Sequence, residues 1–437
     1  MTTPTSLQQR LLDGYLRYYD TAFWLRDSAL MQERRRLLEQ PGRIMAEPLL
    51  EPVLPYPSSD PIGDVCREMG LPDGVARALA AALFEDEDGK PGDETFALRQ
   101  HQAAALRASL RPGTADGRNP VVTAGTGSGK TESFLLPIFA RLLDEARGWP
   151  KDDDAALAPW WRTPGRGWAP LRAGETRPAA MRAMILYPTN ALVEDQISRL
   201  RRAIWSIRDH GGPQLWFGRY TGATIGSGDL PRSTSSDRDR ADAVGAELRA
   251  IEAEFARLEN ADLDVLTQFA HPERGEMLCR WDMVAAPPDI LVTNYSMLNA
   301  MLMRDVEEPL FEATHEWLST GGVFTLVVDE LHLYRGTQGS EVALIIRNLL
   351  HRLGLDPESP RLRIIGTSAS LEPGPDGLHY LEQLFGVPAR AFAVIPGQQQ
   401  PVTRRLPLSR AAALAVDTSD RAGLRDYLVR ERGDEAV

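Results

Sequence analysis

Lysine is almost absent from this chain, and cysteine is scarce. The 49 basic residues include only three lysines, Lys90, Lys130 and Lys151, so arginine carries nearly all of the positive charge. The two cysteines, Cys66 and Cys279, lie far apart, with no pattern of cysteine and histidine ligands around them. This spacing excludes a disulfide framework and gives no indication of a zinc site. Such cysteine use is typical of a cytoplasmic protein, and the cytoplasm is the location we expect.

Long apolar runs are also missing. No stretch approaches the ~20 apolar residues that span a bilayer, and the first twenty residues lack the apolar core of a signal peptide. We therefore expect no membrane association. The formal net charge of −12 argues against a protein that is basic over its whole surface. The negative net charge is still compatible with a motor protein that contacts nucleic acid along one groove.

The first 94 residues are predicted to form a helical N-terminal region and a linker. Apolar residues within 1–40 recur at helical spacing, which predicts a packing helix or, as the alternative, a helix in contact with nucleic acid. Residues 47–61 are rich in proline and predict an extended linker, and residues 85–94 predict a solvated acidic loop. The apolar positions of the helix are Leu7, Leu11, Leu12, Tyr15, Leu16, Tyr19 and Phe23.

Residues 95–385 have a different sequence pattern, in which short apolar runs alternate with segments of helical periodicity. Each run is apolar on both faces, as a parallel strand covered by helices on both sides must be. The pattern predicts an α/β fold, a three-layer αβα domain with a parallel central sheet. The runs are VVTA (121–124), AMILYP (183–188), DILVTN (289–294), FTLVVDE (324–330) and RIIGTSAS (363–370).

Two insertions interrupt this domain, at about residues 148–180 and 225–285. The first carries four tryptophans, which either stack on bases or, as we favour, pin a structural loop. They are Trp149, Trp160, Trp161 and Trp168. The second has an apolar seam of two heptads, too short for a free coiled coil, and predicts a helix that packs on the core or on a helical hairpin. The seam residues are Val244, Leu248, Ile251, Phe255 and Leu258.

The segment VVTAGTGSGKTESF (121–134) follows a predicted strand and precedes a predicted helix, the context of a phosphate-binding loop. Its glycines allow backbone N–H groups to turn toward phosphate oxygens. Lys130 would reach the β- and γ-phosphates and Thr131 would ligate Mg²⁺, so we expect ATP and Mg²⁺ as cofactors. The residues expected around the nucleotide are Ala124, Gly125, Thr126, Gly127, Ser128, Gly129, Lys130, Thr131 and Glu132.

The segment FTLVVDELH (324–332) is a predicted buried strand that ends in two carboxylates. Beside a phosphate loop such a pair has a defined chemistry. Asp329 would hold Mg²⁺ through its water shell, and Glu330 would orient and deprotonate the attacking water. His332 would link this site to the strand that contains residues 363–370. Lys130, Asp329 and Glu330 are therefore the expected catalytic residues.

These elements resemble the ordered motifs of the superfamily 2 DEAD/DEAH-box helicases. The general phosphate-loop pattern has glycine where this chain has Ala124, and the A-x-T-G-x-G-K-T form is the one these helicases use. FALRQHQ (96–102) resembles the family's adenine-reading segment, with Gln102 as the reader. The resemblance implies that the α/β domain is the N-terminal RecA-like lobe of an ATP hydrolase.

Further motifs follow in the family's order. YPTNALVEDQ (187–196), GRYTGAT (218–224) and ILVTNYSML (290–298) resemble segments that grip the nucleic-acid backbone. The resemblance implies contacts from Thr189, Asn190, Thr221, Gly222, Thr293 and Asn294. The triplet at 368–370 resembles motif III, which relays the nucleotide state to the nucleic acid. The coupling residues implied are His332, Ser368 and Ser370.

A closer resemblance extends over about residues 5–385. The motifs above, with DELHLYRGTQGSEVALIIRNLL and the opening LLDGYLRYYDTAFWLRD, are similar to the large prokaryotic helicases of phage-defence systems such as DISARM. They are also similar to related DNA-repair helicases that carry a C-terminal four-cysteine domain. This likeness implies DNA, single-stranded or with a single-stranded region, rather than RNA as the track. It also implies a partner protein from a defence system.

The sequence departs from the family after motif III. A complete motor has a second RecA-like lobe with an arginine finger, usually in a Q-x-x-G-R-x-x-R segment, and residues 386–437 contain none. We expect that segment to lead toward a second lobe from a missing C-terminal part or from a partner chain. The chain is then the first motor lobe of an ATP-dependent DNA helicase or translocase. The alternative is an ATP-binding interaction or scaffold module with little activity alone.

Overall fold

The computed structural model describes most of the chain in two separate units. Residues 1–55 with 400–437 form one unit and residues 56–399 the other. Thr126 and the C-terminal segment from residue 400 onward lie outside the described residues, as do parts of the predicted linker, acidic loop and first insertion. No described helix has the length and apolar character needed to cross a membrane. The described residues are 4–40, 42–46, 54–85, 90–112, 115–125, 127–150, 159–258 and 261–399.

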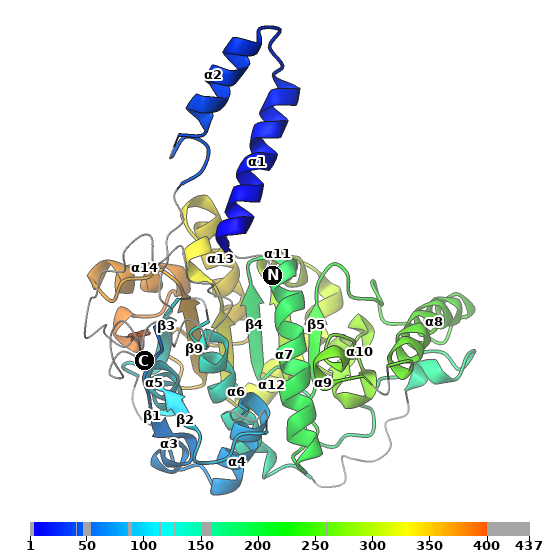
Figure 1. The fold of residues 1–437 in the computed structure, drawn as a ribbon. Helices are drawn as coiled ribbons and strands as arrows, with labels where there is room; N and C mark the ends of the chain where they lie inside the picture. Colours follow the sequence, from blue (N-terminus) through cyan, green and yellow to red (C-terminus); the bar gives the residue numbers. More distant parts are fainter. Residues whose placement is uncertain are drawn as a thin grey trace. The chain divides into compact units, whose positions relative to one another are not determined.

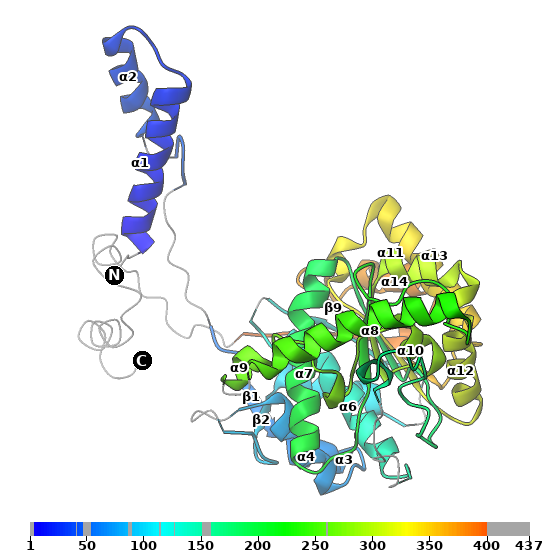
Figure 2. The same ribbon diagram turned by 90° about the vertical axis from the view of Figure 1, so that its right-hand side faces the viewer.

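The first unit is a helical hairpin of α1 (Pro4–Ala22) and α2 (Ser28–Leu38), which lie side by side (Figures 1 and 2). Leu16 is buried between them. The apolar pattern predicted helix throughout residues 1–40, but the chain turns between Ala22 and Ser28. The turn is stabilised by Asp27, whose carboxylate accepts hydrogen bonds from the backbone N–H groups of Ala29 (2.8 Å) and Leu30 (3.2 Å). These are N–H groups that a new helix leaves without intrahelical partners.

The second unit is built on an eight-stranded sheet in which every neighbouring pair of strands is parallel (Figure 1). The predicted parallel α/β fold is confirmed. All strand carboxyl ends therefore meet at one edge, where ligands bind in open α/β sheets. The order across the sheet is β10 (Phe392–Pro396), β3 (Asn119–Thr123), β9 (Leu362–Ser368), β8 (Phe324–Val328), β4 (Ala183–Tyr187), β7 (Ile290–Asn294), β5 (Phe217–Tyr220) and β6 (Glu276–Met277).

Helices bury both faces of this sheet, which is why its strands are apolar throughout. Along β4, Ile185 faces one core, while Met184 and Leu186 face the other. This alternation follows from the two-residue period of a strand. The first core contains α3 (Ile62–Glu68), α4 (Asp73–Leu83), α5 (Gln100–Leu110), α6 (Lys130–Ala146) and α7 (Asn190–Asp209). The second contains α10 (Arg280–Ala285), α11 (Tyr295–Leu302), α12 (Glu308–Ser319), α13 (Gly336–Arg352) and α14 (Pro375–Phe385).

The unit extends beyond the span 95–385 that the alternating pattern covers. On the N-terminal side, α3 and α4 pack into the first core, and β1 (Ser58–Pro61) pairs antiparallel with β2 (Ala97–Arg99). Residues 58–61 of the predicted linker are therefore part of this unit. On the C-terminal side, β10 pairs with β3 at one edge of the sheet. Both extensions bury apolar side chains, such as Leu79 and Phe392, that local patterns do not assign to a sheet.

The tryptophans of the first insertion are packed inside the protein. Trp160 and Trp161 are buried, and Trp168 is half-buried. The indole N–H groups of Trp160 and Trp168 donate to the Asp282 carboxylate at 3.1 and 3.0 Å, and the backbone N–H of Leu171 donates at 3.3 Å. The structural loop, rather than the base-stacking alternative, is what the structure shows. Asp282 lies on α10, so its carboxylate joins the two insertions.

We expect Asp282→Asn to reduce the dependence of stability on pH. Burial raises the pKa of Asp282 to about 7 from its ordinary value of 3.8. Between these values the folded chain holds a proton that the unfolded chain has released, so the free energy of unfolding falls as pH rises from about 4 to about 7. The fall contributed by this group is at most about 4 kcal/mol. Urea denaturation at pH 5 and pH 8 measures it. Asp239→Asn, at an exposed position, is the control, and equal pH dependence in all three proteins would contradict the assignment.

The second insertion forms α8 (Ser235–Ala256), α9 (Leu263–Leu266) and the short strand β6. In α8, Leu248 is buried and the other seam residues are half-buried. The helix packs against the 3-10 turn Trp160–Arg162, and the Phe255 ring lies edge-on to Trp205 at a centroid distance of 5.9 Å. The seam therefore leans on the core, as predicted.

Candidate ATP site and nucleic-acid interface

A cleft of about 670 Å³ opens at the carboxyl edge of the sheet. It is lined by the phosphate loop, the segment around Gln102, the first turns of α7 and the acidic pair at the end of β8. Six of the expected ATP-site side chains line it together. They are Gln102, Lys130, Thr131, Glu132, Asp329 and Glu330.

The phosphate loop connects β3 to α6. Gly127 and Gly129 have left-handed backbone angles, with φ of 75° and 76°, which a residue with a Cβ adopts only at a cost. A Cβ at Gly129 would also lie 2.4 Å from the Gln102 amide nitrogen. At the start of the loop, the Ala124 N–H donates to the Ser368 carbonyl at 3.2 Å and so joins the loop to motif III. Thr126 is not among the described residues.

Three successive carbonyl groups of this loop are held by side chains from β2 and α5. The Arg99 guanidinium donates to Gly127 O at 2.9 Å, and the Gln102 amide donates to Gly129 O at 3.2 Å. Nε2 of His101 lies 2.7 Å from Ser128 O and must carry the proton, because a carbonyl only accepts. Burial lowers the pKa of His101, which keeps the ring neutral. Because these carbonyls are bonded to side chains, they are turned away from the cleft side of the loop, where N–H groups such as those of Gly127 and Gly129 would meet an anion.

Gln102 therefore has a structural contact in addition to its expected contact with adenine. Its amide oxygen accepts from the Arg99 backbone N–H at 3.0 Å while its NH₂ group bonds to Gly129. It lines the cleft, as a reader of the base must. Glu132 lies in the first turn of α6 and accepts from Arg199 of α7 at 3.1 Å. The two side chains form a salt bridge along one wall of the cleft.

The acidic pair is positioned by Thr367 of the neighbouring strand β9. Asp329 is buried and accepts hydrogen bonds from the Thr367 hydroxyl and from the Glu330 backbone N–H (2.9 Å). Burial raises the pKa of Asp329, while the bond from Thr367 opposes the shift. Glu330 has a φ of 55° and is the only non-glycine residue with a positive φ among the described residues. Such a strained backbone persists where its surroundings impose it, and functional sites are a common place for it.

Lys130 and Glu330 face each other across the cleft. The Lys130 Nζ lies 3.7 Å from Glu330 Oε1, and the Lys130 side chain is 13% exposed. On the other side, His332 Nδ1 lies 3.2 Å from Glu330 Oε2. The structure thus brings the cation of the phosphate loop and the carboxylate at the end of β8 to one point.

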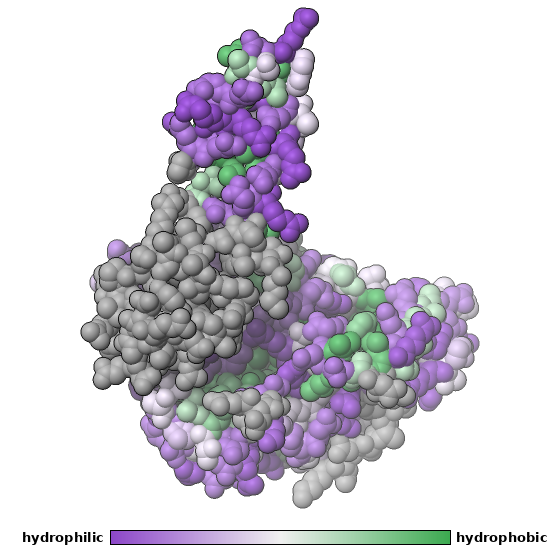
Figure 3. All heavy atoms as spheres, viewed as in Figure 1, coloured by the Kyte–Doolittle hydropathy of each residue, from purple (hydrophilic) through white to green (hydrophobic). Residues whose placement is uncertain are grey.

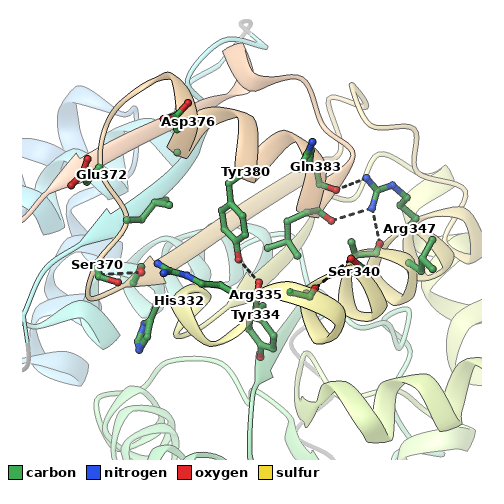
Figure 4. Close-up of a pocket in the computed structure, with 18 residues that line it drawn as sticks. His332, Tyr334, Arg335, Ser340, Arg347, Ser370, Glu372, Asp376, Tyr380 and Gln383 are labelled. Atoms are coloured by element: carbon green, nitrogen blue, oxygen red, sulfur yellow. Dashed lines mark hydrogen bonds between the residues drawn. The ribbon is translucent and has the colours of Figure 1, made fainter.

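The three expected coupling residues line a second pocket of about 780 Å³ between α13 and α14 (Figure 4). The Tyr380 hydroxyl reaches from α14 and donates to the carbonyls of Leu331 and Tyr334, at 2.9 and 2.8 Å. Leu331 and Tyr334 belong to the turn that follows the acidic pair, so Tyr380 ties α14 to that turn. The coupling residues are His332, Ser368 and Ser370.

The expected nucleic-acid residues fall into two groups. Thr189, Asn190 and Gly222 are exposed near the carboxyl edge, and the Asn294 amide donates to the Asn190 side-chain oxygen. Thr293 is buried instead, and its hydroxyl donates to Tyr220 O at 2.7 Å, holding β7 to β5. The backbone N–H of Thr221, which is also buried, donates to Thr224 at 2.9 Å.

Arg280, from the second insertion, acts on the Thr221–Gly222 turn. Its guanidinium donates to the Thr221 carbonyl at 2.7 Å and to the Gly222 carbonyl at 3.1 Å. The arrangement repeats that of the phosphate loop, where side chains also hold the carbonyls. The motif patterns did not single out Arg280, Thr367, Arg99 or His101. Nearness in sequence to recognised motifs was the one indication of a role. Thr367 precedes motif III, and Arg99 and His101 lie within FALRQHQ.

The parallel sheet, the phosphate loop after its strand and the acidic pair at the end of β8 together define a RecA-like α/β fold of the superfamily 2 helicase type. Residues 99–215 match the family model described as DEAD/DEAH box helicase. The chain therefore carries a DEAD/DEAH-box helicase domain.

Among individual proteins, the chain is similar to the Druantia protein DruE of Escherichia coli (strain UMEA 4076-1). The two are 33% identical over 461 residues, which take in 93% of this chain and 23% of DruE. The chain thus spans about a quarter of that relative.

Two solved structures are also similar. The DUF1998 helicase MrfA bound to DNA is 20% identical with a TM-score of 0.41, covering 79% of this chain and 29% of MrfA. The DEAD-box helicase Mss116 bound to ssRNA and UDP-BeF is 13% identical with a TM-score of 0.41, covering 78% of this chain and 46% of Mss116.

Proposed function

We propose that this chain is the first motor lobe of an ATP-dependent DNA helicase or translocase that acts in the cytoplasm in prokaryotic defence against phage. The observation that carries the proposal is the convergence of Lys130 and Glu330, 3.7 Å apart, between a glycine loop and a buried acidic strand end. Phosphoryl transfer needs a cation at the phosphates and a group that activates the nucleophile, and these two residues are of those kinds.

The chain's own groups fit a triphosphate. The N–H groups of the loop at Gly127 and Gly129 would bind phosphate oxygens at the positive end of the 17-residue helix α6. Lys130 would neutralise the β- and γ-phosphates as a point charge. Gln102, which lines the cleft beside the loop, would bind the adenine.

The acidic pair divides its work between metal and water. Thr131 and Asp329 would hold Mg²⁺, which when bound neutralises charge on the phosphates. Glu330 would accept the proton of the attacking water. His332, 3.2 Å from one carboxylate oxygen of Glu330, would keep that side chain directed at the cleft.

Two contacts suggest how the nucleotide state would reach the nucleic acid. Thr367 bonds to Asp329, and the next residue, Ser368, accepts from the phosphate loop at Ala124. A shift at the γ-phosphate would therefore move motif III. Thr189, Asn190 and the turn at Gly222 would grip sugar and phosphate without reading sequence.

The proposals for the nucleic acid on which the motor moves, for the biological role and for the partners are based on the resemblance to phage-defence and DNA-repair helicases. DNA is the proposed track, and a defence-system protein is the proposed partner. The second RecA-like lobe would come from a further part of a longer protein or from a partner chain. An arginine finger from that lobe is worth about 10³–10⁵ in rate in related systems, so the lobe alone would turn over slowly.

We expect ATP turnover by this chain to rise when single-stranded DNA is added and to fall again as salt is raised, because the contacts are with phosphates. The measurement is steady-state phosphate release, with the Glu330→Gln variant as the blank. Turnover at the level of the blank with nucleotide still bound, with DNA present and with a chain that carries the second RecA-like lobe added, would contradict the motor proposal. That result would favour the ATP-binding interaction module.

A further inference from the structure

We propose that the tip of the α1–α2 hairpin is a second nucleic-acid site, which binds single-stranded DNA by stacking on unpaired bases. The inference rests on the proposed function in one respect, since a motor that moves on DNA supplies single strands. The site itself is argued from the hairpin alone. It consists of Tyr15, Tyr18, Phe23 and Trp24, with Arg17 and Arg26 beside them.

The aromatic residues of the tip are unlike the others in the chain. Tyr15, Tyr18, Phe23 and Trp24 are 53%, 59%, 56% and 66% exposed. Every other aromatic side chain among the described residues is buried or half-buried. Figure 3 shows apolar residues of the hairpin between hydrophilic ones at its surface. Four exposed rings within ten residues form a surface that a packing helix does not need.

The packing face of the hairpin is a different one. Leu16 is buried, and Leu12 and Tyr19 are half-buried. Tyr15 and Tyr18 precede Leu16 and Tyr19 by one position, which turns them about 100° around the helix. The exposed rings are therefore not a remnant of the contact between α1 and α2.

The charges around the tip are arranged for an anion. Asp20 is committed to α2, since its two oxygens accept from Arg34 at 3.0 Å and Arg35 at 3.1 Å. Asp27 is committed to the cap of α2. Arg17 and Arg26 are exposed, next in sequence to the exposed Tyr18 and close to Trp24. Asp20 is thus paired with two arginines, while among the described residues Asp27 accepts only from backbone N–H groups and Asp13 only from Gln9. Arg17, whose Nε donates to the Asp13 carbonyl at 3.2 Å, and Arg26 are exposed cations in a chain of net charge −12.

The tip is also held in shape. Arg34 donates to the carbonyls of Tyr19 and Phe23 on either side of the helix end. The Phe23 ring contacts Tyr18 edge-on at 6.4 Å and Tyr19 in a tilted arrangement at 5.4 Å. A surface ordered before binding loses little conformational entropy on binding.

Exposed rings interleaved with arginines fit single-stranded nucleic acid better than a dry protein interface. Bases stack on aromatic faces while guanidinium groups bind the intervening phosphates, and the combination tolerates any sequence. The core of a protein interface is instead depleted in charge. A motor needs contacts of the sequence-tolerant kind.

The test is the affinity of the full chain for a fluorescent dT₂₀ oligonucleotide, measured by anisotropy without nucleotide. Trp24→Ala is expected to weaken binding about 5- to 150-fold, the effect of losing one stacked base, with the salt slope unchanged. Trp24→Phe should retain most of the affinity. Arg26→Ala should lower the slope of log affinity against log salt by about 0.7, the value for one phosphate of a single strand. Leu37→Ala, another exposed apolar position on α2, is the control and should bind as wild type.

Equal dT₂₀ affinity in wild type and Trp24→Ala would overturn the proposal. So would a Trp24→Ala variant that binds dT₂₀ normally but sediments as a smaller species than wild type, because the tip would then be a protein interface. Circular dichroism verifies that the variants keep their helices. The outcome is separable from that of the proposed function, since ATP binding and DNA-stimulated turnover depend on Lys130 and Glu330 in the other unit. Trp24→Ala should leave ATP affinity unchanged.

Discussion

Glu330→Gln is expected to lower ATP turnover by about 10³-fold while Mg-ATP still binds, because a positioned general base contributes roughly 10²–10⁴ in rate. Glutamine keeps the length and hydrogen-bonding capacity of the side chain but cannot accept the proton of water. The strained backbone at φ 55° and the bond that the Glu330 backbone N–H donates to the Thr367 hydroxyl are independent of the carboxylate, so the loop should keep its shape. Phosphate release at saturating ATP measures the effect.

The control for this substitution is Glu312→Gln, at an exposed position on α12. It removes the same charge from the same unit, and wild-type turnover is expected. A Glu330→Gln enzyme that keeps turnover within about tenfold of wild type would show that another group activates the water. His332 and Asp329 would then be the next residues to replace.

Lys130→Ala is expected to weaken ATP binding about 10- to 150-fold, since a hydrogen bond to a charged group contributes roughly 1.5–3 kcal/mol. The Lys130 side chain is 13% exposed, so its charge acts on the phosphates with little screening by water. The loss should be larger for ATP than for AMP, because Lys130 is proposed to contact the β- and γ-phosphates. Calorimetric titration with each nucleotide measures it.

The scarcity of lysine supplies a matched control for that experiment. Lys90 is exposed and is not among the residues that line the cleft. Lys90→Ala should bind ATP as tightly as wild type. Equal weakening in both variants would point to a general effect of net charge rather than to a phosphate contact.

The central sheet and the convergence of the residues of the candidate ATP site could be predicted because both depend on local sequence. A parallel strand buried on two faces must be apolar throughout, so VVTA and FTLVV stand out in the sequence. In a parallel sheet the residues that follow the strands meet at one edge. Lys130 and Glu330, 200 positions apart, were therefore expected to converge, and they do.

The residues that set the shape of the site could not be predicted in the same way. Arg99, His101 and Arg280 bond to backbone carbonyls. Every residue has a backbone carbonyl, so the sequence does not indicate which one a side chain will contact. Thr367 matters because β9 lies beside β8, and the order of strands is not written in any one of them. The inclusion of α3 and β10 in the α/β unit also depends on tertiary packing, which local sequence patterns do not reveal.

The hairpin shows another limit of the apolar pattern. Leu16 and Tyr15 both fit a helical repeat, yet one is buried and the other is 53% exposed. Spacing identifies an apolar stripe but not how much of it a partner covers. The turn at Asp27 was missed because the apolar repeat continues through it, although an aspartate followed by serine is a capping signal.

The measurement that tests the account most directly is the binding of Mg-ATP to this chain, compared among wild type, Lys130→Ala and Glu330→Gln under the same conditions. The account predicts saturable binding in wild type and in Glu330→Gln, and affinity lower by at least about tenfold in Lys130→Ala. Indistinguishable affinities in the three proteins, or no saturable binding in wild type, would contradict the claim that the glycine loop and the end of β8 form an ATP site.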